Sequence, residues 1–137
     1  MTDFACITEH GLRRQDRWGS GHFGASRGSR RHSGLDLVAS PGEQILSPID
    51  GTITRIAYPY SGTLEYQGAV IVDASGLEVR IYYVAGVELG AVKAGDVIGT
   101  AQNLRRRYPD ITNHVHVEIR VSGAKVDPTP YFSNCQL

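Results

Sequence analysis

The stretch His114-Val115-His116-Val117-Glu118-Ile119-Arg120-Val121 is the clearest structural signal in this chain of 137 residues. Its polar and apolar side chains alternate strictly, which is the pattern of a β-strand with one face in a core. The two histidines therefore project from the same side of a strand, with Cα atoms about 6.6 Å apart. One imidazole can bind a metal ion while the other stands beside it.

Shorter β-favouring runs precede this strand, separated by turn signals such as Pro41-Gly42 and Ala74-Ser75-Gly76. These runs are Leu35–Ala39, Gln44–Leu46, Thr52–Tyr58, Ala69–Asp73, Leu77–Val84 and Val97–Thr100. The one stretch that could form a turn of helix is Asn103–Tyr108. Several short strands at close spacing predict an all-β fold, either an antiparallel sandwich or an open barrel.

The first part of the chain has a different composition. Residues 1–23 are polar and contain glycines at positions 19 and 21, which is typical of loops. We expect an irregular N-terminal arm over residues 1–23, followed by a single domain over residues 24–137.

Composition and hydropathy give no support for a nucleic-acid-binding or membrane-spanning protein. Lysine plus arginine and aspartate plus glutamate number 14 each, so the net charge is zero and gives no reason to expect nucleic acid as the main partner. We interpret Arg105-Arg106-Arg107 as a solvated loop. No window approaches the roughly 18 apolar residues of a membrane span.

The N-terminal residues and the cysteines bear on localisation. The first ten residues lack the basic segment and the apolar stretch of a secretory signal peptide. We expect a protein that works where it is made or reaches the cell envelope by a non-classical route. Cys6 and Cys135 could form a disulfide, but without an export signal we expect free thiols.

A second pair of metal-binding residues lies upstream of the strand. His32 and Asp36 are four residues apart, and Gly34 permits a bend between them. Together with His116 they make a three-ligand set of two imidazoles and one carboxylate. This set suits one zinc ion and leaves a fourth position for water or substrate, as catalytic zinc sites do. Glu118, on the histidine face, could orient an imidazole, but we expect it to pair with an arginine across the strands.

These motifs resemble the lysostaphin-type zinc endopeptidases of bacterial cell walls. The resemblance covers about residues 24–132 and includes the histidine motifs above, Ala39-Ser40-Pro41-Gly42, Ile45–Ile53, Val92–Gly99 and Val126–Phe132. It implies that His32, Asp36 and His116 are the zinc ligands, that His114 is the catalytic base, and that the substrates are peptidoglycan peptides.

One position departs from the family pattern. The family usually has a second active-site histidine seven residues after a turn glycine, and counting from Gly76 gives Tyr83. This substitution more closely resembles the leukocyte-derived chemotaxin branch of the family. That branch keeps the fold and the zinc site of the peptidases. A phenol can donate a hydrogen bond to an oxyanion. Tyr83 therefore has either this catalytic role or a place in the core, in register with Val79 and Ile81.

Two functions remain open on the sequence alone. The first is a zinc-dependent endopeptidase acting on peptidoglycan peptides, delivered by a phage tail or secretion apparatus. The second is a non-catalytic zinc-binding module that grips the cell wall or serves a structural role. The retained His114 favours the enzyme, because a structural zinc site needs no base beside it. Tyr83 favours the module.

Overall fold

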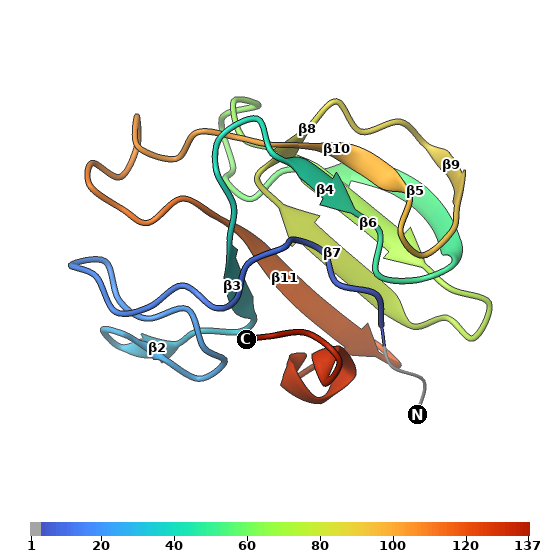
Figure 1. Ribbon diagram of the computed structural model, residues 1–137, viewed down its shortest axis with the longest axis horizontal. Coiled ribbons are helices and arrows are strands. Elements are labelled where there is room, and N and C mark those ends of the chain that lie inside the picture. Colours follow the sequence, from blue (N-terminus) through green and yellow to red (C-terminus); the bar gives the residue numbers. More distant parts are fainter. Residues whose placement is uncertain (1–3) are drawn as a thin grey trace.

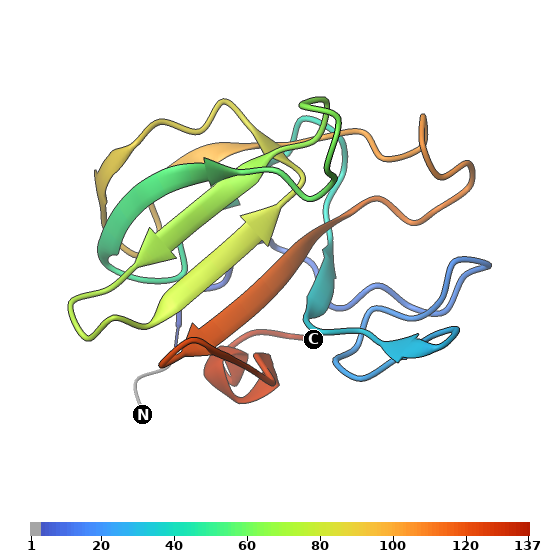
Figure 2. The same cartoon turned by 180° about the vertical axis from the view of Figure 1, so that it is seen from behind.

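The computed structural model describes residues 4–137, and its regular secondary structure is almost entirely β-strand. The large antiparallel sheet has the order β12-β11-β7-β6-β5-β9, and β3 also pairs with β11. Its strands are β3 (Leu35–Val38), β5 (Gly51–Ala57), β6 (Gly68–Val72), β7 (Glu78–Tyr82), β9 (Gly90–Val92), β11 (His114–Val121) and β12 (Ala124–Val126). Figure 2 shows β5, β6, β7 and β11 side by side.

A smaller sheet packs against the large one. It consists of β4 (Gln44–Leu46), β10 (Val97–Ala101) and β8 (Val84–Ala85), in the order β4-β10-β8. In Figure 1 this sheet lies in front of β6 and β7. Ile45 and Ile98 of the small sheet share one buried cluster with Ile71, Val79 and Ile81 of the large sheet. The predicted all-β, antiparallel architecture is confirmed as two packed sheets.

Four short strands and one helical turn were not predicted. The strands β1 (Ser26–Arg27) and β2 (Arg30–Arg31) form a separate hairpin, β9 and β12 lie at the edges of the large sheet, and η1 (Thr129–Phe132) is a 3-10 helix. The unpredicted strands are short and mostly exposed, so they carry no alternating hydrophobic pattern. The stretch around Leu104 makes a single turn, closed by the Tyr108 amide donating to the Leu104 carbonyl.

The irregular N-terminal segment packs on the same core, although its first three residues lie outside the described part of the chain. Phe4 and Ile7 are buried in the main cluster. The Arg13 amide donates to the Asp36 carbonyl at 2.8 Å, and Leu12 forms a bridge with Leu37. The segment therefore runs beside β3 and reaches the face on which the candidate site lies.

The expectation of free thiols is wrong. Cys6 and Cys135 form a disulfide, with Cα atoms 5.8 Å apart, within the usual range for such bonds. The Phe4 amide donates to the Tyr131 carbonyl, and this contact brings the two ends of the chain together. The approach of the two Cα atoms depends on the fold and is not encoded in the N-terminal residues. Among the described residues, no helix is long and apolar enough to cross a membrane.

Candidate metal centre

Strand pairing brings two of the predicted ligands together. In the β3–β11 pair, Asp36 lies directly opposite His116, and directly opposite residues place their side chains on the same face. Gly34 serves a different purpose from the bend we expected. A Cβ at this position would lie 2.9 Å from Cε1 of His116 and would collide with the Val117 carbonyl. A glycine is required here because β11 passes too close for a side chain.

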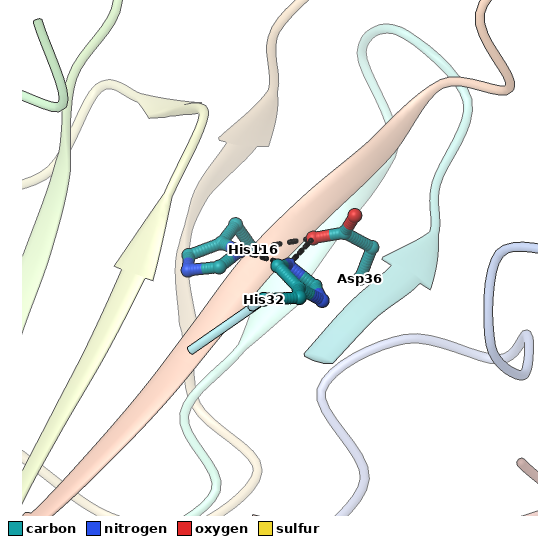
Figure 3. A group of neighbouring side chains, drawn as sticks. All are labelled: His32, Asp36 and His116. Carbon is teal, nitrogen blue, oxygen red and sulfur yellow. Dashed lines mark hydrogen bonds and ion pairs between the residues drawn. The ribbon is translucent and has the colours of Figure 1, made fainter. Parts of the chain in front are cut away.

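His32 reaches the same point from the β1–β2 hairpin. Its amide donates to the Ala25 carbonyl, and its carbonyl accepts from the Gly24 amide, each at 2.8 Å. This extends the hairpin pairing to the start of β3. Figure 3 shows the imidazoles of His32 and His116 and the carboxylate of Asp36 converging.

The three converging atoms form a nearly regular triangle. His32 Nε2 lies 3.0 Å from His116 Nδ1, His116 Nδ1 lies 2.9 Å from Asp36 Oδ1, and His32 Nε2 lies 3.2 Å from Asp36 Oδ1. Zinc bonds of about 2.0–2.1 Å at tetrahedral angles place ligand atoms about 3.3 Å apart. The residues and their spacing fit one zinc ion.

The outer nitrogen of each imidazole is held in place. His32 Nδ1 lies 3.0 Å from the His22 carbonyl, which can only accept a hydrogen bond, so Nε2 keeps its lone pair for the triangle. His116 Nε2 lies 2.9 Å from Glu118 Oε2. Such outer partners fix the tautomer and orientation of metal-binding histidines. Glu118 therefore orients an imidazole, and the expected cross-strand arginine pair is wrong: its arginine partner is Arg120, on its own strand.

The electrostatics of the triangle favour a cation. Burial by itself would lower the pKa of His116, but the carboxylates of Asp36 and Glu118 outweigh it and raise that pKa to about 9. Burial would raise the pKa of Asp36, yet His114, His116 and His32 hold it well below its ordinary value. A positive charge among these groups is therefore stabilised.

Arg13 completes the site, and sequence reasoning missed it. Its Nε and Nη2 donate to Asp36 Oδ2 at 3.1 and 3.0 Å, so Oδ1 alone faces the triangle. Its Nη1 donates to Asp16 at 2.9 Å. Arg13 is 3% exposed, and Asp36 is 2% exposed. The guanidinium thus fixes the rotation of the carboxylate. No spacing rule links an arginine in an irregular segment to this carboxylate, so the sequence held no signal for it.

His114 lies beside the triangle rather than in it. Its Nδ1 donates to the Thr112 carbonyl at 2.8 Å, and its Nε2 lies 3.5 Å from Asp36 Oδ2. Burial lowers the pKa of His114, so the imidazole is neutral at neutral pH, with a lone pair on Nε2. This is the geometry and protonation state of a general base.

Tyr83 lines the cleft and also packs against a buried cluster of Tyr66, Leu104 and Ile111, so its catalytic role and its packing role both stay predictions. Its φ angle of 72° breaks the strand alternation after Ile81, and the predicted single strand Leu77–Val84 is divided at this residue into β7 and β8. The ring of Tyr83 meets His114 edge to face, with centroids 5.7 Å apart. Tyr82, which sequence reasoning did not select, stacks on His116 at 5.8 Å.

The hydroxyl of Tyr83 belongs to a chain of phenols. It lies 2.7 Å from the hydroxyl of Tyr60, which lies 2.6 Å from that of Tyr108. The Nε of Arg107 donates to the Tyr108 hydroxyl at 3.3 Å. Burial raises the pKa of Tyr83 above its ordinary value, so the phenol keeps its proton.

These residues line a cleft of about 510 Å³ that also contains the triangle. Trp18, Tyr60 and Tyr108 contribute aromatic surface to it, and the hairpin contributes arginines. A peptide bond placed in this cleft can meet a metal ion, a neutral imidazole and a phenol together.

Comparison with known proteins gives one family. The model of peptidase family M23 matches residues 30–128. Leukocyte cell-derived chemotaxin-2 of Mus musculus is 33% identical over 121 residues, which is 88% of this chain and 78% of that protein.

Solved structures show the same fold. The solution structure of lysostaphin, from Staphylococcus simulans, has a TM-score of 0.69 at 20% identity. The match covers 94% of this chain, and this chain spans 56% of that one. A zinc-containing peptidase from Vibrio cholerae has a TM-score of 0.59 at 22% identity, covering 88% of this chain and 39% of that chain.

Proposed function

The chain belongs to peptidase family M23, and on this premise we propose that it is a zinc-dependent endopeptidase that hydrolyses peptidoglycan peptides. The observation that carries the proposal is the triangle of His32, Asp36 and His116 with a neutral imidazole beside it. A site that only stabilised the fold would need no buried base at its edge. Delivery to the cell envelope by a phage tail or a secretion apparatus stays a prediction from the sequence.

The residues divide the work of hydrolysis. A bound zinc ion supplies Lewis acidity and lowers the pKa of the attacking water. The Nε2 of His114 accepts a proton from the nucleophile, because its other nitrogen already donates to Thr112. Arg13 and Glu118 hold Asp36 and His116 in orientation and take no part in proton transfer.

Tyr83 is the residue that we propose donates a hydrogen bond to the oxyanion. A guanidinium cannot accept a hydrogen bond, so Arg107 must donate to Tyr108. Head-to-tail hydrogen bonds strengthen one another, which favours donation from Tyr108 to Tyr60 and from Tyr60 to Tyr83. The proton of Tyr83 is then left to point into the cleft.

Hydrolysis is tested on purified peptidoglycan from several bacterial types. We expect the zinc-loaded protein to release new peptide termini, and His114→Ala to keep its zinc while losing most of the activity, because a positioned general base contributes about 10²–10⁴-fold. His10, an exposed histidine outside the cleft, provides the control His10→Ala. If zinc is bound and no termini appear from any peptidoglycan, the alternative of a non-catalytic zinc-binding module replaces the enzyme.

A separate prediction concerns Tyr83→Phe. The variant should fold and bind zinc as the wild type does, but kcat should fall about 10-fold or more, the scale of one transition-state hydrogen bond. Tyr58→Phe is the matched control, because Tyr58 is 46% exposed and lies outside the cleft. An unchanged kcat in Tyr83→Phe would show that the phenol only packs against His114.

A further inference from the structure

The charges around the cleft are strongly unbalanced. Six cationic side chains line it against two carboxylates, those of Asp36 and Glu118, although the whole chain has a net charge of zero. The cations are Arg13, Arg27, Arg30, Arg31, Arg120 and Lys125. A zinc ion would increase the excess of positive charge. Clefts of one sign concentrate ligands of the opposite sign.

Four of the six cations already have carboxylate partners. Arg13 binds Asp36 and Asp16. Arg27 lies 3.5 Å from Asp36. Arg120 and Lys125 lie 3.2 and 3.7 Å from Glu118. The nearby carboxylates balance the charges of these four side chains, so they contribute little net charge for binding a ligand.

The other two cations, Arg30 and Arg31 of strand β2, have no such partner. The Nη1 of Arg31 donates to the Gly24 carbonyl at 3.3 Å, and neither guanidinium lies within ion-pair distance of a carboxylate among residues 4–137. Both residues are exposed at the wall of the cleft. They immediately precede His32, so they present their charges beside the metal ligands.

We propose that Arg30 and Arg31 form an anion subsite that selects peptides with a free carboxylate next to the bond to be cut. This inference rests on the proposed function and names its substrate class. A carboxylate of a peptide, on a side chain or at the C-terminus, has a neutral counterpart of nearly the same shape in its primary amide. A guanidinium binds a carboxylate through two parallel hydrogen bonds, which an amide cannot match. The subsite therefore discriminates the acid form from the amide form.

The test uses two synthetic stem tetrapeptides that differ in one group, a carboxylate or its primary amide. Binding is measured by calorimetry on zinc-loaded His114→Ala protein, in which the removal of the base slows turnover by about 10²–10⁴-fold. We expect the acid peptide to bind about 10-fold more tightly than the amide, as one or two exposed charged hydrogen bonds allow. The preference should shrink as the salt concentration rises.

The double variant Arg30→Gln/Arg31→Gln should lose the preference for the acid peptide and bind the amide peptide with unchanged affinity. Arg30→Lys/Arg31→Lys should restore part of it, which separates loss of charge from damage to the hairpin. The pair Arg105→Gln/Arg106→Gln removes the same charge outside the cleft and should have no effect.

Two outcomes overturn the subsite. The first is that the acid and amide peptides bind with equal affinity to the protein in which Arg30 and Arg31 are intact. A sulfated polysaccharide could instead bind more tightly than the acid peptide at physiological salt and compete with it, which would assign the arginines to a polymer. Cleavage by the wild type is followed in parallel. A binding preference for the acid peptide without cleavage supports the subsite and contradicts the hydrolase. Cleavage with equal binding of the acid and amide peptides supports the hydrolase and contradicts the subsite.

Discussion

Replacing His116 with alanine is expected to remove zinc altogether, lowering the metal content from one ion per chain to none. The substitution deletes one corner of the triangle, and two ligands 3.2 Å apart remain, His32 Nε2 and Asp36 Oδ1. It also leaves Glu118 without its imidazole partner. Zinc present at 1,000 times its dissociation constant adds about 4 kcal/mol to the free energy of unfolding. His116→Ala should lose that stabilisation.

The measurement is elemental analysis after dialysis, combined with thermal unfolding with and without zinc. His32→Ala and Asp36→Ala should behave like His116→Ala. His114→Ala should keep its zinc, because Nε2 of His114 lies outside the triangle. If His114→Ala lost zinc as completely as His116→Ala, the assignment of the two histidines would have to be reversed.

Replacing Arg13 with methionine is expected to lower the free energy of unfolding by about 3–5 kcal/mol, the scale of removing one partner from a buried ion pair. The variant leaves Asp36 Oδ2 buried without its two donors. The freed carboxylate can rotate, so zinc affinity should also fall, by about 10–100-fold as for other outer-shell partners.

Urea unfolding of the metal-free protein and a chelator competition for zinc measure the two effects separately. Arg14→Met is the matched control, since Arg14 is exposed beside Arg13. Arg13→Lys keeps the positive charge, but an ammonium group lacks the planar set of donors that binds both Asp36 and Asp16. Its losses of stability and of zinc affinity should therefore be smaller than those of Arg13→Met. An Arg13→Met protein with wild-type zinc affinity would show that the triangle holds its shape without the arginine.

The alternation of β11 was readable from sequence because it has one face in the core and one in the cleft. Val115 and Val117 are fully buried, and His116 faces Asp36 across the strand pair. The pairing of β3 with β11, which brings the two ligands together, was not predicted from these local patterns. The role of Gly34 was not readable, because it depends on how closely another strand passes.

The features that the sequence did not reveal depend on long-range contacts. The alternation rule places Tyr83 in register with Val79 and Ile81, but its positive φ angle ends the strand, and the ring lies between the cleft and a separate buried cluster. Arg13 reaches Asp36 because an irregular segment runs beside β3. Cys6 meets Cys135 across 129 residues of sequence separation. No local periodicity encodes contacts of this kind.

The bond between Cys6 and Cys135 turns almost the whole chain into a covalent ring. A single cut by a protease at an exposed turn, for example at Gly62 or at Gly28 in the β1–β2 hairpin, leaves one molecule whose parts cannot diffuse apart. Exposed turns of this kind are the preferred sites of nicking. After a cut at Gly62, the pairing of β5 with β6 still holds both sides of the break, so the nicked molecule can keep its shape and its cleft. An agent that reduces the bond would open the ring and let the pieces separate.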